Sequence, residues 1–510
     1  MTYRYITTPI YYVNDRPHLG HAYASVHADI MARYLRAAGH QVLLLTGADE
    51  HGEKIAKAAM QANEAPRAFA ERHARTFEEA WRRLSVEPDR FVRTTAAAHA
   101  KVVSECLTRL FAAGEIYLAD YEGLYSIGQE RFVTDKELVD GKLPEDKDPP
   151  VLRREPNYFF RMEAHREWMR QLLLDTPDLI QPAQYRHEIL KLLEEPIGDL
   201  SISRPVDRLE WGIPIPWDAG HVTYVWFDAL LSYVSPLGYP DQPAFADYWP
   251  SVRHVIGKDI LRTHTLFWLS MTHALGIAPY RRLHVSGHLL GSDGRKMSKS
   301  LGNGVDPLEA ADTYGVDALR YTLIREVSFG FDGIISNAVL EQRLNRDLAD
   351  DLGNLAARTL AMVMQYRSGS VPAPKGYGAS EEAIVGRASE LPAVVLALVE
   401  EMKLGRAAEQ VMEFVKHLNS YVASSAPWML AKDPSASDRL DTVLYTLLEA
   451  LYSVSNLLHP VMPGKMDALR SLLGISAGPG WDVRWGQGVK PASAIKEGIL
   501  FPKHPDPGNA

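Results

Sequence analysis

"YRYITTPIYYVNDRPHLGHAYASVHADIMARYLRAAGHQVLLLTGADEHG", residues 3–52, decides the fold. Residues 3–10 are β-branched and aromatic, as in a strand, and a loop with a proline follows at residues 14–21. Apolar side chains then recur one helical turn apart, at Ala22, Val26, Ile30 and Tyr34. Residues 41–52 are an apolar run that ends in Gly and acids, typical of a strand buried on both faces. Strand, helix and strand at this spacing predict a parallel α/β sheet that binds ligands at the carboxyl ends of its strands.

The length and composition limit the class of protein. At 510 residues the chain is too long for one core, so two to four domains are expected. No apolar run approaches the ~20 residues of a membrane span, and the N-terminus lacks the pattern of a signal peptide. We therefore expect a cytoplasmic enzyme. The net charge of −9 argues against a protein that coats nucleic acid generally, but not against a partner docked on a local basic patch.

An insertion interrupts the alternation of predicted strands and helices, which then resumes. Residues from about Tyr117 to Arg204 are rich in Pro and charge, which indicates an insertion of short strands and loops. Sheet-like runs return at residues 221–234, 252–260 and 282–290, and they predict the second half of the sheet. From Leu344 onward amphipathic segments at 348–366, 409–424 and 444–464 predict an antiparallel helical bundle.

Cysteine usage excludes two kinds of site. Cys106 is the only cysteine, so the chain has no intramolecular disulfide and no cysteine-based zinc cage. It lies in "VVSECLTRLF", an amphipathic helical pattern, and we interpret it as a thiol packed in the core.

"HLGH", residues 18–21, stands where the first strand hands over to the first helix. A helix N-terminus binds anions, and two histidines add donors for phosphate oxygens. Gly20 lets a flat base or ribose approach the backbone closely. The motif therefore favours phosphate binding; the alternative is a pair of histidines that only cap the helix.

"GSDGRKMSKSLGNG", residues 291–304, is a loop hinged by glycines. It carries the cations Arg295, Lys296 and Lys299. Such a loop can swing two lysines over a triphosphate and neutralise the charge that develops on leaving pyrophosphate. A solvated surface loop is the alternative, which the occurrence of "HLGH" in the same chain disfavours.

"HLGH" and "KMSKS" together resemble the two nucleotide-binding motifs of class I aminoacyl-tRNA synthetases. The wider run "TPIYYVNDRPHLGHAYASVHADIMARY", with "GADEHG", "YVWFDALLSY", "IGKDILRTHTLFWL" and "DLADDLGNL", is similar to the bacterial methionyl-tRNA synthetases in particular. The motifs follow one another in the family's order along nearly the whole chain.

The resemblance implies a doubly wound parallel Rossmann-type sheet with an inserted connective domain, followed by an α-helical anticodon-binding bundle. The implied segments are 1–116 and 223–290 for the two halves of the catalytic domain, 117–222 for the insert, 291–343 for the "KMSKS" loop and stem-contact segment, 344–500 for the bundle and 501–510 for a flexible tail.

The family's reaction has two steps: methionine and ATP form methionyl-adenylate and pyrophosphate, and the terminal ribose of tRNA then takes the methionyl group and releases AMP. Such phosphoryl chemistry needs positioning and charge stabilisation more than covalent help. The resemblance gives ATP and Mg²⁺ as cofactors and His18, His21, Lys296 and Lys299 as catalytic residues. Lys299 matches the family's most critical lysine. Gly20, Met297 and Ser298 complete the implied ATP site.

The methionine pocket is also implied motif by motif. Asp49 matches the carboxylate that holds the substrate ammonium, although it could instead cap the following helix. The walls match Ile10, Tyr12, Trp226, Ala229, Tyr233, Ile260 and His264. Aromatic edges suit a thioether, and Tyr12 or His264 could touch the sulfur. Each aromatic taken alone is more often part of a core.

Three alternative functions remain open. Leucine, isoleucine or valine synthetases need a large editing domain, because an apolar pocket discriminates one methylene by only ~1–3 kcal/mol, and the insert is too short for one. A cysteine synthetase needs a zinc held by thiolates. A non-catalytic paralogue that merely binds tRNA is disfavoured by the intact motifs.

The insert departs from many relatives, which carry Cys-x-x-Cys knuckles there. Ser126 and Gln129 stand where one such pair would fall. We therefore expect a knuckle that folds without zinc.

The bundle is expected to read the anticodon of tRNA(Met), initiator and elongator alike. Asn354 and Arg358 lie four apart, hence on one helical face, and match family positions that contact the CAU anticodon. Trp428 matches an aromatic on which an unstacked base lies. A surface Asn–Arg pair and a core Trp are the alternative. No DNA or membrane partner is expected, and the chain lacks the family's extra dimerising domain, so we expect a monomer.

Overall fold

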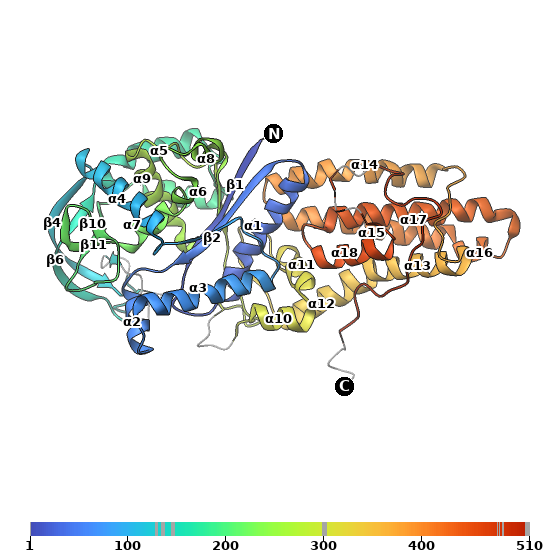
Figure 1. The fold of residues 1–510 in the computed structure, drawn as a ribbon, viewed down its shortest axis with the longest axis horizontal. Helices are drawn as coiled ribbons and strands as arrows, with labels where there is room; N and C mark the ends of the chain where they lie inside the picture. The colour runs from blue at the N-terminus through green and yellow to red at the C-terminus, as the bar shows by residue number, and fades with distance from the viewer. Residues whose placement is uncertain are drawn as a thin grey trace.

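The computed structural model describes residues 2–127, 131–133, 138–143, 148–297, 303–476, 478, 480–481 and 484–504. An α/β part and a helical part lie side by side along the long axis (Figure 1). Within these ranges, no helix has both the length and the apolar character that crossing a bilayer requires.

The α/β part is built on one parallel sheet of six strands. Their order across the sheet is β3 (Arg90–Arg93), β2 (Gln41–Asp49), β1 (Tyr3–Tyr12), β12 (Arg253–Gly257), β13 (Arg282–Ser286) and β7 (Ile180–Gln181). Every neighbouring pair in this order is parallel. The order reverses between β1 and β12, and this switch point is where open α/β sheets bind their ligands.

The predicted strand–helix–strand unit is confirmed. β1 is followed by α1 (Leu19–Ala37) and β2, and β1 and β2 pair in parallel. All four side chains predicted one turn apart on α1 are fully buried: Ala22, Val26, Ile30 and Tyr34. Successive residues of β2 enter opposite cores, Leu44 on the α1 side and Leu43 and Leu45 on the other, as the twofold period of a strand requires.

Helices cover both faces of the sheet. They are α2 (Glu53–Gln61), α3 (Pro66–Arg83), α4 (Ala97–Ala112), α7 (Val225–Leu231), α8 (Pro243–Tyr248) and α9 (Trp268–Ala274). Cys106 on α4 is fully buried, which confirms the packed thiol.

The insert forms two small antiparallel sheets. One has the order β5 (Arg131–Val133), β4 (Ile116–Ser126), β6 (Val151–Phe160) and β8 (Leu200–Ser201). The other has the order β10 (Pro214–Ile215), β11 (Asp218–Thr223) and β9 (Ser203–Pro205).

The predicted segment 117–222 treats the insert as one continuous stretch outside the main sheet, but in the structure this stretch is interrupted. After β6 the chain returns to the main sheet through α5 (Arg166–Asp175), adds β7 at its edge beside β13, and continues into α6 (Ala183–Leu192). β7 has only two residues, too few for a periodic signal in the sequence.

The prediction that residues 221–234 belong to the main sheet is wrong. β11 ends at Thr223 in a small antiparallel sheet, and α7 follows directly. Nearly every residue of α7 is buried, Asp228 among them, so no exposed polar face gives its sequence a helical period that would distinguish it from a buried strand. The runs at 252–260 and 282–290 do contain β12 and β13.

Three helices connect the sheet to the bundle: α10 (Pro307–Tyr314), α11 (Val316–Glu326) and α12 (Asn337–Arg343). Between α11 and α12, β15 (Gly333–Ile334) pairs in parallel with β14 (Leu289–Leu290). A π-helical stretch, Leu344–Gly353, continues α12.

The helical prediction from Leu344 onward is confirmed. The bundle consists of α13 (Asn354–Arg367), α14 (Ala379–Glu400), α15 (Leu404–Ser425), the short α16 (Pro427–Leu430), α17 (Ser437–Leu458) and α18 (Pro463–Leu472). Its apolar side chains form one continuous core with α1 and α3. The two parts of the molecule therefore share a core rather than meeting only at a polar surface.

The start of the predicted flexible tail is packed instead. Phe501 is 4% exposed, and the backbone N–H of His504 donates to Oδ1 of Asn345 over 2.9 Å. A buried aromatic ring and a backbone hydrogen bond hold these residues to the π-helical stretch. Residues 505–510 lie outside the described part of the chain.

Candidate active site

The first candidate group, "HLGH", lies at the switch point of the sheet, between the end of β1 and the start of α1. His18 is the N-cap of α1, and its Nδ1 accepts a hydrogen bond from the Gly20 N–H over 3.1 Å. Nδ1 of His21 accepts from the His18 N–H over 3.3 Å, and the two rings stack with centroids 3.6 Å apart. The histidines thus do cap the helix. Because each neutral ring accepts through Nδ1, Nε2 carries the proton and is the donor of each ring.

An aromatic cluster supports His21. Its ring centroid lies 4.7 Å from that of Tyr11 and 5.4 Å from that of Phe77 on α3. The Tyr11 hydroxyl pairs with Ser25 Oγ at 2.8 Å. The imidazole therefore stands on a packed surface that restricts its orientation.

The described start of the second candidate group is a tight turn after β14. Lys296 forms a bridge with Leu290, and the Gly291 N–H donates to the Arg295 carbonyl over 2.9 Å. The Asp293 carboxylate accepts from the Arg295 N–H and from Nδ2 of Asn303, at 3.0 and 3.1 Å. These contacts close the turn at residues 291–295 and hold Asn303, at the other end of the loop, against it. Met297 is partly buried against the core, while Ser298 and Lys299 lie outside the described residues.

One stretch of chain, residues 327–334, contacts both α1, which follows the histidine motif, and β14, which precedes the lysine loop. The Tyr23 hydroxyl on α1 donates to the Val327 carbonyl over 3.4 Å, and the His27 ring lies 5.1 Å from Phe329. Seven residues after Val327, Ile334 pairs with Leu290, the bridge partner of Lys296. The helix that begins with the histidine motif and the strand that precedes the lysine loop thus adjoin the same short segment.

Lys258 is a further candidate residue that the sequence analysis did not single out. It follows β12 directly, and its Nζ contacts both carboxylate oxygens of Asp332, at 2.6 and 2.8 Å. Asp332 also accepts from the His288 N–H, after β13. Burial, together with Lys296 and Lys258, lowers the pKa of His288. A cation directly after a buried strand, in "GKDI", was the available signal.

The candidate methionine pocket centres on Tyr233 and His264. Nδ1 of His264 lies 3.0 Å from the Ile260 carbonyl, which can only accept, so Nδ1 donates. Nε2 then accepts from the Tyr233 hydroxyl over 2.7 Å. Burial lowers the pKa of His264 to about 4, so the ring is neutral near pH 7. His264 belongs to a π-helical turn, Thr263–Phe267, a distortion that is frequent at functional sites.

Trp226, Ile260 and Asp49 lie near this pair, and the other predicted pocket residues belong to the same or neighbouring elements. The Trp226 ring on α7 meets the His264 ring edge-on, with centroids 6.4 Å apart. Ala229 is on the same helix, and Tyr12 and Asp49 are register partners at the carboxyl ends of β1 and β2. Burial first, and then Tyr11 and Asp49, raises the pKa of Tyr233. Four predicted residues pack, partly buried, against the core that contains Tyr233: Ile10, Tyr12, Trp226 and Ile260.

A buried charge cluster beneath the pocket was also missed. Nδ1 of His51 lies 2.8 Å from Oδ2 of Asp228, and Nε2 of His99 lies 3.4 Å from Oδ1. Asp228 is fully buried. Burial raises the pKa of its carboxyl, but His51 and His99 outweigh this effect, and the pKa lies below its ordinary value. The cluster joins the "GADEHG" loop to α7, so it fixes Asp49 relative to Trp226. The sequence motifs "GADEHG" and "YVWFDALLSY" were used for Asp49 and Trp226, but not for His51 or Asp228.

Within the described ranges, no group of three or more His, Cys, Asp or Glu side chains is arranged to hold a metal ion. Mg²⁺ at nucleotide sites is usually held by substrate phosphates, water and one or two carboxylates.

The candidate anticodon residues lie on the bundle. Asn354 and Arg358 are exposed on α13. The Arg358 guanidinium lies 5.9 Å from the ring centroid of Trp428, which is 39% exposed on α16. The structure thus brings Arg358 and Trp428 together at a solvent-accessible surface (Figure 1 labels α13 and α16).

Comparisons with known families match most of the chain. The family described as "tRNA synthetases class I (M)" matches residues 4–148 and 137–360. The family described as "Anticodon-binding domain of tRNA ligase" matches residues 381–469.

Similar curated proteins carry one name. The chain is 49% identical to the methionine--tRNA ligase of Deinococcus radiodurans, over 99% of this chain and 74% of that protein. It is 40% identical to the methionine--tRNA ligase of Caldanaerobacter subterraneus, over 98% of this chain and 78% of that one.

Solved structures agree over the whole length. Mycobacterium tuberculosis methionyl-tRNA synthetase in complex with methionyl-adenylate superposes with a TM-score of 0.94 at 37% identity, over 98% of this chain and 100% of the other. The ligand-free form of that synthetase gives a TM-score of 0.88 at 34% identity, over 99% of both chains.

Proposed function

The chain belongs to the methionine--tRNA ligase family of class I aminoacyl-tRNA synthetases, and from this premise we propose how its residues divide the work. The enzyme activates methionine with ATP as methionyl-adenylate and attaches it to tRNA. The alternatives that the sequence left open give way, because the similar proteins are methionine--tRNA ligases along nearly the whole chain.

His18, Gly20 and His21 are the proposed phosphate-binding group. Their position at the positive end of a 19-residue helix favours an anion, and the capping geometry directs each Nε2–H away from the helix backbone. These donors suit the α-phosphate, where negative charge shifts toward pyrophosphate as the methionine carboxylate attacks. Mg²⁺ bound to the triphosphate would shield the negative charge of the phosphates. The histidines hold and orient the triphosphate.

The lysine loop is proposed to close over the leaving group. Lys296 forms a bridge with Leu290, and Lys296 and Lys258 both lower the pKa of His288, so two lysines lie near this edge of the sheet. We assign Met297, Ser298 and Lys299 to the same function from the motif. Lys299 would meet the β- and γ-phosphates, where a cation stabilises departing pyrophosphate.

The proposed methionine site has the strongest geometric support, which is the Tyr233–His264 hydrogen bond. This bond occupies the Nε2 lone pair of a neutral imidazole at the base of an aromatic pocket. A thioether is uncharged and polarizable, so it gains from such a lining and loses nothing to an unpaired charge. Asp49 would bind the ammonium group, and the pocket wall would consist of Ile10, Tyr12, Trp226, Ala229 and Ile260.

The bundle binds tRNA through its anticodon-binding domain. Asn354, Arg358 and Trp428 are the proposed readers of the CAU anticodon, which initiator and elongator tRNA(Met) share. The exposed Trp428 ring beside the Arg358 guanidinium is a stacking platform for an unstacked base.

Three further assignments complete the proposal. The enzyme acts in the cytoplasm and as a monomer. The monomer is supported by the spread of its exposed large apolar side chains, which come from the insert, the catalytic part and the bundle alike, for example Leu152, Phe331 and Met429. The insert folds without zinc, supported by Tyr125, whose ring lies 4.5 and 4.2 Å from the Arg153 and Arg208 guanidinium carbons. Light scattering and a metal assay of the purified protein test the last two.

Amino-acid-dependent ATP–pyrophosphate exchange tests the active-site assignment. We expect exchange with methionine and only background exchange with leucine, isoleucine and valine. Lys299→Ala is expected to slow the exchange and to leave the KM for methionine nearly unchanged. Wild-type exchange in that variant would refute the role of Lys299, and equal exchange with leucine would refute the pocket.

A further inference from the structure

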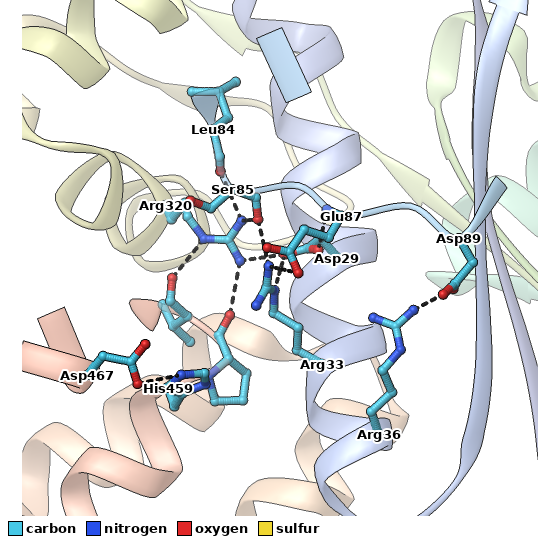
Figure 2. A network of polar contacts seen from close by, with 12 residues as sticks. Asp29, Arg33, Arg36, Leu84, Ser85, Glu87, Asp89, Arg320, His459 and Asp467 are labelled. Carbon is cyan, nitrogen blue, oxygen red and sulfur yellow. Dashed lines mark hydrogen bonds and ion pairs between the residues drawn. The ribbon is translucent and has the colours of Figure 1, made fainter. Parts of the chain in front are cut away.

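Arg320 joins three segments that are distant in the sequence. It lies on α11 and is 0% exposed. Its five N–H donors meet five acceptors: Nε donates to the Val461 carbonyl at 2.9 Å, Nη1 to the Leu84 and Ser85 carbonyls at 3.1 and 2.8 Å, and Nη2 to Asp29 Oδ2 and the Pro460 carbonyl at 2.6 and 3.0 Å (Figure 2). Every donor of the guanidinium is thereby used.

Four of these acceptors are backbone carbonyls just past helix ends. Leu84 and Ser85 follow α3, and Pro460 and Val461 lie in the turn between α17 and α18. Leu84 is the C-cap of α3, and the other three carbonyls lie just beyond the C-terminal ends of α3 and α17, where the helix dipole is negative. The Arg320 cation therefore stabilises the C-terminal end of α3 in the catalytic part and that of α17 in the bundle at once.

The fifth acceptor, Asp29, connects Arg320 to α1. Asp29 is 0% exposed, and its Oδ2 also accepts from Nε of Arg33 at 2.8 Å, while its Oδ1 accepts from the Glu87 N–H at 3.0 Å. A buried charge that is fully paired holds one geometry, because any displacement leaves it without a partner. α1 is thus fixed in rotation and along its axis.

A second contact ties α1 to the same helix of the bundle. The Tyr34 hydroxyl donates to the Leu457 carbonyl, near the end of α17, over 2.8 Å. Both contacts attach α1 to the C-terminal end of α17 and the turn that follows it. His21 precedes Asp29 by eight residues on α1, about 12 Å along a rigid helix.

We propose that Arg320 is a positioning residue for adenylate formation, through which the α17–α18 turn of the anticodon-binding bundle sets the place of the His18–His21 pair. The bundle then takes part in activating methionine even when no tRNA is bound. The inference rests on the proposed role of His18 and His21 in binding phosphate.

The proposal makes a specific demand on kinetics. The methionine pocket is built on β1, β2, α7 and the π-helical turn, and the bonds that the structure gives Arg320 reach none of them. A shift of α1 therefore moves the groups that act on phosphate in the transition state, and kcat falls while the KM for methionine does not change.

The test uses Arg320→Lys, which keeps the charge but not the planar fork of donors. In ATP–pyrophosphate exchange at saturating ATP, without tRNA, we expect kcat to fall about tenfold or more, because misplacing a catalytic group by ~1 Å can cost 10²-fold. The KM for methionine should stay within about twofold.

A double-mutant cycle with His21→Ala separates positioning from general destabilisation. Effects at sites more than ~7–10 Å apart normally add. If Arg320 acts through α1, the Arg320→Lys loss is smaller once His21 is alanine, because only His18 is then left to be misplaced. If the two losses multiply instead, Arg320 does not act through His21 and the inference is overturned. If His21→Ala alone exchanges like wild type, the proposed role of His21 fails, and the inference with it.

Arg325→Lys is the matched control. Arg325 is on the same helix and donates to Glu409 of α15 at 2.9 Å, so it also reaches the bundle. The bonds that the structure gives it do not include α1. This variant should keep kcat within about twofold of wild type; a loss as large as that of Arg320→Lys would overturn the inference.

Asp29→Asn tests the inference from the other partner, and serves if Arg320→Lys does not fold. The amide is nearly isosteric and keeps one oxygen acceptor. A folded variant, verified by circular dichroism, should lose kcat in the same direction, and wild-type kcat would overturn the proposal.

Discussion

The Tyr233 hydroxyl lies 2.7 Å from Nε2 of His264 and donates a hydrogen bond to it, while Nδ1 of the same ring donates to the Ile260 carbonyl at 3.0 Å. Both ring nitrogens are therefore engaged, and the ring is held neutral and fixed in orientation at the base of the pocket. The first prediction follows from this pair.

Tyr233→Phe removes the donor and leaves a buried imidazole lone pair without a partner, which costs about 1–3 kcal/mol. The KM for methionine in pyrophosphate exchange should rise about fivefold or more, and kcat should change less. Tyr280→Phe is the control, because the Tyr280 hydroxyl is buried and has no partner in the described part of the chain. An unchanged KM in Tyr233→Phe would contradict the role of the hydrogen bond.

Gly20→Ala should impair adenylate formation without affecting methionine binding. A Cβ on Gly20 would lie 3.0 and 3.1 Å from Cε1 and Nδ1 of His18, so the imidazole must move by a few tenths of an ångström. We expect kcat for pyrophosphate exchange to fall about tenfold. Gly386→Ala on α14, where a Cβ meets nothing within 4 Å, should leave kcat unchanged. A wild-type rate for Gly20→Ala would show that the ring position is not critical.

The folded protein should lose stability as the pH falls from about 6.5 to about 4. Burial lowers the pKa of His27 and of His264 from 6.5 to about 4. In this window the unfolded chain binds protons that the folded chain excludes, so protonation favours unfolding. Each group removes about 2 kcal/mol of unfolding free energy between pH 7.5 and 5.

His27→Gln isolates one contribution to this acid sensitivity. Nδ1 of His27 lies 2.8 Å from the Tyr23 carbonyl, and a glutamine amide can donate to the same oxygen. In urea unfolding at pH 7.5 and 5, the variant should lose about 2 kcal/mol less than wild type. Parallel losses in the two proteins would show that His27 is not titrating in this range.

Trp428→Ala should impair tRNA charging far more than methionine activation. Stacking of one base on an aromatic side chain is worth about 1–3 kcal/mol, so the KM for tRNA should rise about 5- to 100-fold while pyrophosphate exchange is unchanged. Met429→Ala, at a neighbouring residue that is 56% exposed, is the control. Equal losses in both reactions would indicate a role in folding instead.

Local patterns in the sequence predicted the elements that hold the proposed nucleotide site. β1 is β-branched and aromatic, α1 has a helical hydrophobic period and β2 is an apolar run, and "HLGH" falls between the first two. The pocket residues depended on a resemblance to a family, because no single aromatic distinguishes a ligand from a core side chain. The structure places Trp226, Tyr233, Ile260 and His264 around one another.

The remaining features are set by tertiary structure. α7 is buried on all sides, so no period separates it from a strand, and β7 is too short to have one. Arg320 binds carbonyls near residues 84 and 460, and a carbonyl has no signature in a sequence. His51 and Asp228 are 177 positions apart, and only the folded sheet makes them partners.

The return of the chain to β7 has a consequence for shortening this protein. The insert consists of two separate excursions, one between α4 and α5 and one between α6 and α7, so each could be replaced by its own linker. Excising residues 117–222 in one piece would also remove β7, α5 and α6, and would expose the hydrogen-bonding edge of β13. A bare parallel edge recruits strands from other chains, so that truncated protein should aggregate, whereas a version trimmed twice should remain monodisperse.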